Sequence, residues 1–219
     1  MPKLSIIIPC FHEHINHASL TRRCLSSIES ATKIPYELCL VENLNRWVND
    51  SGNIYVHFSE PRTYAQNVNT GLKIATGDYL CVMNNDVLVC DDWIETILKC
   101  FEIDDCGIAT IDSNQYQRRP EDKIYEDFWG ALWVIKRSVM EKVGLLDETF
   151  VHAFDDADYW VRTYLAGYKI YMNRSQKVTH GDGSTIHNFN NHHQQYLAMR
   201  KQFNEKHDGC TLPIFERLR

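Results

Sequence analysis

The stretch Asp78–Asp86, with the sequence DYLCVMNND, decides the fold of this chain. Gly77 precedes it, and its apolar run ends abruptly in three polar residues. An apolar run of this length between such breaks predicts a buried strand. In open α/β sheets, ligands bind at the carboxyl ends of the strands. Asn84, Asn85 and Asp86 are therefore placed where a ligand would bind.

Oxygen ligands at this spacing suit a hard divalent cation that holds a phosphate. The same Asn-Asn-Asp sequence is also ordinary composition for a turn after a strand. The choice between a ligand site and a plain turn depends on the rest of the chain.

Strands and helices are predicted to alternate before this stretch. The predicted strands are Leu4–Pro9, Glu37–Glu42 and Ile54–Phe58, and the predicted helices are Ser19–Ala31 and Thr63–Ala75. This alternation is typical of an α/β fold with a mostly parallel central sheet flanked by helices. The first half therefore looks like a Rossmann-like nucleotide-binding unit. It has neither GxGxxG nor GxxxxGK, which counts against dehydrogenases and P-loop proteins.

The remainder of the chain continues the mixed pattern. We predict strands at Gly107–Ile111, Phe128–Ile135, Lys169–Met172 and Lys177–Thr179, helices at Asp92–Phe101, Lys136–Val143 and Asn188–Lys206, and an irregular loop at Asp112–Asp127. The last helix is polar, and its nearby His187, His192 and His193 lack a supporting acid at ligand spacing. We interpret these histidines as solvated surface rather than as a metal site.

A second polar cluster contains Asp155, Asp156 and Asp158, at the start of a predicted helix that runs through Ala166. Acids in the first turn of a helix are stabilised by its dipole and can cap it. We assign Asp158 to that structural role. Three carboxylates within four positions exceed what a cap needs, and like charges so close raise at least one pKa. Such a carboxylate can act as a general base near neutral pH.

Bulk properties narrow the class of protein. The 219 residues carry a formal net charge of -6, which counts against general affinity for nucleic acid or anionic membranes. No apolar run reaches transmembrane length, and no signal peptide is recognisable. None of the eight cysteines forms a Cys-x-x-Cys pair, so a reduced, cytoplasmic chain is the simplest expectation.

Taken together, the chain resembles the family-two inverting glycosyltransferases with the GT-A fold, in particular their small, single-domain, soluble, rhamnosyltransferase-like members. The resemblance covers nearly the whole sequence. It rests on segments that occur in the family's order: Ser5–Pro9, Glu42, Ala65–Gly71, Ala75–Leu80, Asn84–Asp86, Gly144–Phe150, Asp155–Arg162 and Val178–Ser184. Each segment is weakly specific by itself, and their common order and spacing make the resemblance strong.

The resemblance implies a role for each matching residue. Asp86 would ligate a divalent cation, Mn2+ or Mg2+, on the donor diphosphate, and His180 could be a further ligand. Asp156 would be the general base for the acceptor hydroxyl, and Asp155 would orient the acceptor. The implied donor-binding residues are Pro9, Phe11, Glu42, Arg62, Asn69, Asn84 and Asn85. Trp129 and Trp133 offer faces for stacking of the acceptor sugar, although a core role is equally open for one of them.

These roles describe a direct displacement. The diphosphate leaves on one side of the sugar while Asp156 takes the proton of the attacking hydroxyl on the other side, so the anomeric carbon inverts. We expect one domain over 1–219: a nucleotide-sugar-binding half (1–86), an acceptor and catalytic half (87–189) and a C-terminal helical tail (190–219). The expected donor is a UDP-sugar, with a dTDP-linked deoxysugar as the second choice, and the acceptor is a hydroxyl of a glycan or glycoconjugate.

Three positions depart from the family pattern. Asn84 and Glu42 each replace the usual Asp, and Asp155 replaces the usual Glu. The loss of a charge at Asn84 would weaken cation affinity or leave Asp86 as the only direct protein ligand. We expect addition of a single sugar rather than processive polymerisation, because the sequence shows no membrane helices like those of polysaccharide synthases.

Two other classes of protein remain alternatives. A nucleotidyltransferase would carry a glycine-rich, basic loop after the first strand, whereas the segment Pro9–His14 contains no Gly or Lys. The other alternative is a catalytically impaired domain of the same fold that binds carbohydrate or nucleotide sugar, which Asn84 keeps open.

Overall fold

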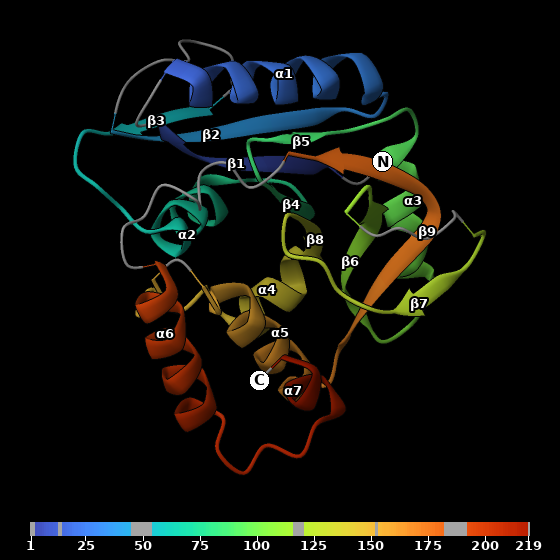
Figure 1. The fold of residues 1–219 in the computed structure, drawn as a ribbon. Coiled ribbons are helices and arrows are strands. Elements are labelled where there is room, and N and C mark those ends of the chain that lie inside the picture. Colours follow the sequence, from blue (N-terminus) through green and yellow to red (C-terminus); the bar gives the residue numbers. More distant parts are fainter. Residues whose placement is uncertain are drawn as a thin grey trace.

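The computed structural model describes residues 3–12, 15–44, 54–115, 121–151, 153–181 and 192–218. They form a mixed sheet with helices on both of its faces (Figure 1). The strands are β1 (Leu4–His12), β2 (Tyr36–Leu44), β3 (Ile54–Phe58), β4 (Tyr79–Met83), β5 (Val87–Leu88), β6 (Cys106–Ser113), β7 (Ile124–Glu126), β8 (Leu132–Lys136) and β9 (Lys169–His180). Their order is β3-β2-β1-β4-β8-β6-β9-β5, and β7 pairs with β9.

The helices are α1 (Ile15–Ala31), α2 (Tyr64–Ile74), α3 (Trp93–Leu98), α4 (Arg137–Val143), α5 (Asp155–Leu165), α6 (His192–Lys206) and α7 (Pro213–Leu218), with a short 3-10 helix η1 (Lys99–Glu102) after α3. In the part of the chain that the structure describes, no helix is long and apolar enough to cross a membrane. The predicted residues 188–191 of the last helix lie outside the described part, and α7 was not predicted.

The strands in the parallel half of the sheet are apolar on both faces because helices cover both faces. β3, β2, β1 and β4 run parallel, as the alternation of strands and helices predicted. Ile6 and Ile8 pack in the same cluster as residues of α1, whereas Ile7 packs in the cluster that contains residues of α2. A Cβ on Gly71 would lie 2.2 Å from Ile7 Cγ2, so α2 approaches β1 too closely for any larger residue there.

Pro9 was predicted to end the first strand, but β1 continues to His12. The pairing of β1 with β4 covers only Leu4 to Ile7, while the pairing with β2 continues to His12. Pro9 lies past the last pair with β4, at a position where one side of β1 is free of a neighbouring strand. A proline without an N–H is tolerated there.

The second half of the sheet contains the unpredicted strand β5 and differs from the prediction in three further places. β8 begins at Leu132 rather than at Phe128, because a turn at Gly130 and Ala131 precedes it. The two predicted strands after Lys169 are one strand, β9, whose pairing with β6 shifts register between Ile111 and Asp112. The segment predicted as an irregular loop contains β7, which pairs antiparallel with β9.

Candidate active site

The polar triplet lies at the carboxyl end of β4, as the sequence predicted, and a second strand brings a histidine to it. Asp86 precedes β5, which pairs antiparallel with β9 so that Val87 is opposite His180. His180 Nε2 lies 3.1 Å from Asp86 Oδ1. The Gly181 N–H donates to the Asp86 carbonyl at 3.0 Å. The two predicted metal-site residues are therefore held together by strand pairing.

Asp86 and His180 fit a single divalent cation. A carboxylate oxygen and an imidazole nitrogen are both ligands for such ions. Two ligands at right angles with bonds of about 2.1 Å are about 3.0 Å apart, close to the observed separation. Asp86 is only 8% exposed. The described residues contain no cluster of three or more His, Cys, Asp or Glu that could hold a metal.

The predicted base cluster lies at the start of α5, which begins at Asp155. Asp155 is 7% exposed, and its Oδ2 atom has no hydrogen-bond partner among the described residues. Burial and the charge of Asp156 raise the pKa of Asp155 to about 7. Burial also raises the pKa of Asp156, whose Oδ1 accepts a hydrogen bond from the Ala157 N–H at 2.7 Å. This pair can exchange a proton near neutral pH, as a general base requires.

The turn before β8 packs against this carboxylate pair. A Cβ on Gly130 would lie 2.1 Å from Asp156 Oδ2, so only glycine leaves room for the carboxylate. The following Ala131 accepts a hydrogen bond from the Asn84 N–H at 2.8 Å. The turn thus joins the base cluster to the end of β4.

Tyr64 contacts Asn84 and is influenced by the charges of both clusters, and it was missed in the sequence. Its hydroxyl donates to Asn84 Oδ1 at 3.1 Å. Burial, followed by the negative charges of Asp155, Asp156 and Asp86, raises its pKa well above the ordinary value. The proximity of these residues comes from the packing of α2 against the sheet, and only the position of Tyr64 at the start of a capped helix could have pointed to it.

The residues predicted to line a nucleobase pocket lie at the carboxyl ends of β1 and β2. Pro9 and Phe11 of β1 are in register with Val41 and Asn43 of β2. Glu42, between those two β2 residues, is fully buried and accepts a hydrogen bond from the Tyr55 hydroxyl. The structure thus brings three of the predicted donor-binding residues to one sheet edge. Because side chains alternate along a strand, Glu42, which is opposite Cys10, lies on the other face of the sheet from Pro9 and Phe11.

Three other predicted donor-binding residues make contacts within the protein. The Arg62 guanidinium donates to Asn67 Oδ1 at 3.1 Å and lies 3.9 Å from the centre of the Phe58 ring. Asn69 Nδ2 donates to the Leu146 carbonyl at 2.9 Å, which ties α2 to the segment before α5. Their direct contact with a donor stays a prediction.

Asn85 makes the third of these contacts, because its Nδ2 donates to Thr21 Oγ1 on α1 at 2.8 Å. Of the triplet, Asn84 and Asp86 contact residues of the site, whereas Asn85 contacts the first helix.

The two tryptophans have different surroundings. Trp129 lies edge-on to His180, with ring centres 5.5 Å apart, and is placed beside the site. Trp133 on β8 is 1% exposed and packs against Tyr159 in the core. Trp129 is 6% exposed and belongs to the main core cluster, so both rings are buried, and the stacking role of Trp129 stays a prediction. Ser184 and His187 lie outside the described residues.

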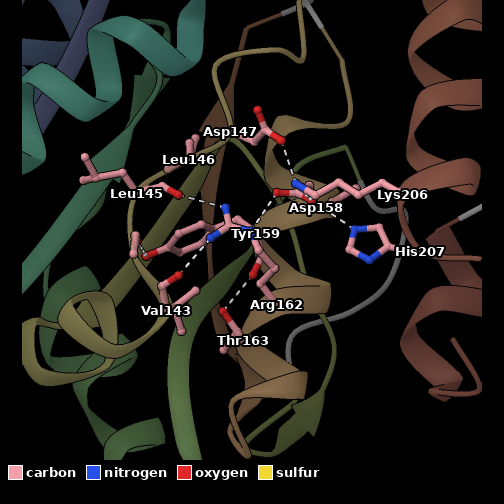
Figure 2. Close-up of polar contacts among 12 residues, drawn as sticks. Val143, Leu145, Leu146, Asp147, Asp158, Tyr159, Arg162, Thr163, Lys206 and His207 are labelled. Atoms are coloured by element: carbon pink, nitrogen blue, oxygen red, sulfur yellow. Dashed lines mark hydrogen bonds and ion pairs between the residues drawn. The ribbon is translucent and has the colours of Figure 1, made fainter.

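Asp158 is structural, as the sequence suggested, but it acts through tertiary contacts rather than as a cap: the N-cap of α5 is Phe154, without a side-chain cap hydrogen bond. Asp158 connects α5 to the end of α6 (Figure 2). It is fully buried. Its Oδ2 accepts from Arg162 Nε at 2.8 Å, and its Oδ1 lies 2.6 Å from Lys206 Nζ and 2.9 Å from His207 Nε2. Lys206 also contacts Asp147 at 2.6 Å. These contacts link α5, the helix that carries Asp155 and Asp156, to the end of α6.

Comparison with known proteins identifies the class. A family model described as Glycosyl transferase family 2 matches residues 5–210, and the chain belongs to this family. It is 22% identical over 229 positions to the O-antigen biosynthesis protein RfbC of Myxococcus xanthus. The match covers 84% of this chain and 18% of that protein, so the chain spans about a fifth of the length of this relative.

Solved structures show the same fold. The mannosyltransferase PcManGT from Pyrobaculum calidifontis, in complex with GDP-Man and Mn2+, matches with a TM-score of 0.72 at 19% identity, over 99% of this chain and 68% of that one. GalNAc-T7 with UDP, GalNAc and Mn2+ matches with a TM-score of 0.68 at 15% identity, over 82% of this chain and 44% of that one. The GT-A fold expected from the sequence is confirmed.

Proposed function

We propose that this chain is an inverting glycosyltransferase that moves a hexosyl or deoxyhexosyl group from a nucleotide-diphosphate donor to a hydroxyl of a glycan or glycoconjugate. The observation that carries the proposal is the arrangement around Tyr64. The Tyr64 hydroxyl donates to Asn84, and the charges of Asp86, Asp155 and Asp156 all raise its pKa. Asp86 lies 3.1 Å from His180, and the turn at Gly130 and Ala131 contacts both Asp156 and Asn84. A cation-binding pair and a proton-accepting pair around one centre suit a displacement reaction.

Each pair would act on a different part of the substrates. Asp86 and His180 would hold a divalent cation, Mn2+ or Mg2+, which when bound supplies positive charge for the leaving diphosphate. Asp156 would accept the proton of the attacking hydroxyl, and Asp155 would orient the acceptor. Burial raises the pKa of both carboxylates, and that of Asp155 to about 7, so the Asp155–Asp156 pair could hold and release a proton near neutral pH. We propose that the Trp129 ring, whose centre lies 5.5 Å from that of His180, stacks on the acceptor sugar.

The class of donor is proposed from the residues at the carboxyl ends of β1 and β2. Glu42 would accept hydrogen bonds from the base, with Pro9 and Phe11 lining the pocket. We propose a UDP-sugar first and a dTDP-linked deoxysugar second. The solved neighbours are complexes with GDP-Man or UDP, each with Mn2+, which supports a sugar nucleotide and a cation without selecting one nucleotide. We also propose a cytoplasmic location, in keeping with eight free thiols.

Calorimetric titration tests this function. UDP, GDP, dTDP, UDP-glucose, GDP-mannose and dTDP-rhamnose would each be titrated into the protein with and without Mn2+. Manganese-dependent binding of one nucleotide class supports the role of Asp86 and identifies the donor class. Binding of a sugar nucleotide without any turnover would favour the second candidate, a catalytically impaired binding domain, for which Asn84 in place of Asp is the motivating observation. Absence of all nucleotide binding would reject both.

A further inference from the structure

Asn84 and Tyr64 form a hydrogen-bonded pair where the family pattern has an aspartate. An aspartate carboxylate can only accept hydrogen bonds, whereas an asparagine amide has one accepting oxygen and two donating N–H bonds. The direction of the amide therefore decides what Asn84 offers to a ligand. The Tyr64 hydroxyl donates to the amide oxygen at 3.1 Å.

The Tyr64 side chain comes from a fixed backbone position. Thr63 caps α2 with a reciprocal pair of hydrogen bonds: Thr63 Oγ1 accepts from the Gln66 N–H at 3.2 Å, and Gln66 Oε1 accepts from the Thr63 N–H at 3.0 Å. Burial and the neighbouring carboxylates raise the pKa of Tyr64, so the phenol keeps its proton at neutral pH. The ring thus presents a hydrogen-bond donor in a defined direction.

The backbone of Asn84 is anchored as well. Its N–H donates to the Ala131 carbonyl at 2.8 Å, and its carbonyl accepts from the Val87 N–H at 3.2 Å. In the side chain of Asn84, the amide oxygen Oδ1 accepts the hydrogen bond from the Tyr64 hydroxyl. Among the described residues, the Asn84 NH2 group has no hydrogen-bond partner.

We propose that Tyr64 is a positioning residue that holds the Asn84 oxygen, so that the Asn84 NH2 group faces the donor and binds one of its oxygen atoms. The inference rests on the proposed function and adds a selectivity to it. Two N–H donors select an accepting oxygen, either on the diphosphate or on a sugar hydroxyl. This chain would thus use a neutral amide to donate a hydrogen bond where the family pattern has an accepting carboxylate.

A double-mutant cycle tests the role of Tyr64. Donor binding and steady-state kinetics would be measured for wild type, Tyr64→Phe, Asn84→Ala and the double variant, with UDP-glucose, GDP-mannose and dTDP-rhamnose in saturating Mn2+. We expect Tyr64→Phe to raise the donor Kd and KM about fivefold and leave kcat within about twofold, the size of one lost hydrogen bond. In the Asn84→Ala background the same change should have no further effect, because the group that Tyr64 positions is absent.

Two further variants sharpen the result. Tyr171→Phe removes a hydroxyl that donates to Asp105 at 2.9 Å outside the site, and it should leave the donor Kd unchanged. Asn84→Asp keeps an acceptor for Tyr64 but removes the NH2 group, and it should weaken donor binding about tenfold or more. Equal losses for UDP and UDP-glucose would assign the contact to the diphosphate, and a loss confined to the sugar nucleotide would assign it to a sugar hydroxyl.

Several results would overturn the inference. They are an unchanged Kd in Tyr64→Phe, losses that add in the double variant, or donor binding by Asn84→Asp as tight as that of wild type. In each case wild type still binds the donor, so the proposed function stands while the role of Tyr64 fails. If wild type binds none of the nucleotides, the proposed function and this inference fail together.

Discussion

Replacement of Asp158 by Asn should destabilise the protein by about 3 kcal/mol. The Asp158 carboxylate is fully buried, and Arg162, Lys206 and the imidazole of His207 all lie within 2.9 Å of it. Removal of one member of a buried ion pair costs about 3–5 kcal/mol, because the partner charges remain without compensation. The lower end applies here, since Lys206 keeps Asp147 at 2.6 Å and Arg162 keeps the carbonyls of Val143 and Leu145.

Urea unfolding followed by far-UV circular dichroism measures this loss. For a chain of this size, about 3 kcal/mol corresponds to a fall in Tm of about 6–12 °C. Glu205→Gln is the matched control, because Glu205 pairs with Lys201 at 3.7 Å on the exposed side of α6. The control should change the free energy of unfolding by less than about 0.5 kcal/mol. A loss of less than about 1 kcal/mol in the free energy of unfolding of Asp158→Asn would refute the view that Asp158 stabilises the packing of α6 against α5.

Three further predictions concern the site itself. Because the pKa of Asp155 is raised to about 7, the folded protein holds a proton that the unfolded chain releases near pH 4, so the free energy of unfolding should fall as the pH rises from about 4 to about 7. Urea titrations of Asp155→Asn should lack this component, and an equal slope in both proteins would contradict it. Gly130→Ala places a Cβ 2.1 Å from Asp156 Oδ2 and should lower kcat about 100-fold while sparing donor binding, so an unchanged kcat would speak against the assigned base. His180→Ala should weaken Mn2+ binding in the presence of UDP at least about tenfold by calorimetry, and unchanged affinity would remove His180 from the metal site.

The parallel half of the fold could be predicted because short apolar runs in the sequence mark each of its strands. Runs such as Leu4–Pro9 are apolar on both faces, and only a strand covered by helices on both sides needs that pattern. β5 and β7 could not be predicted in this way, because strands of two and three residues show no periodicity. They exist because β9 passes alongside them and supplies hydrogen-bond partners.

The candidate site was predictable to a similar degree. Asp86 and His180, 94 positions apart, were associated through the resemblance to a family, and the structure brings them within 3.1 Å. Tyr64 was not found, because its nearness to the carboxylates depends on how α2 packs against the sheet. The surroundings of Trp133 and the contact of Asn85 with Thr21 likewise depend on tertiary packing that no local pattern shows.

The measurement that tests the central claim most directly is a comparison of wild type and Asp156→Asn, with donor binding and sugar release measured on the same preparations. The variant keeps nearly the same shape but loses the carboxylate that would accept the proton of the acceptor. We predict that the donor Kd stays within about twofold, while turnover of the sugar nucleotide falls by about 100-fold or more. Turnover equal to that of wild type would contradict the assignment of Asp156 as the base and, with it, the proposed mechanism.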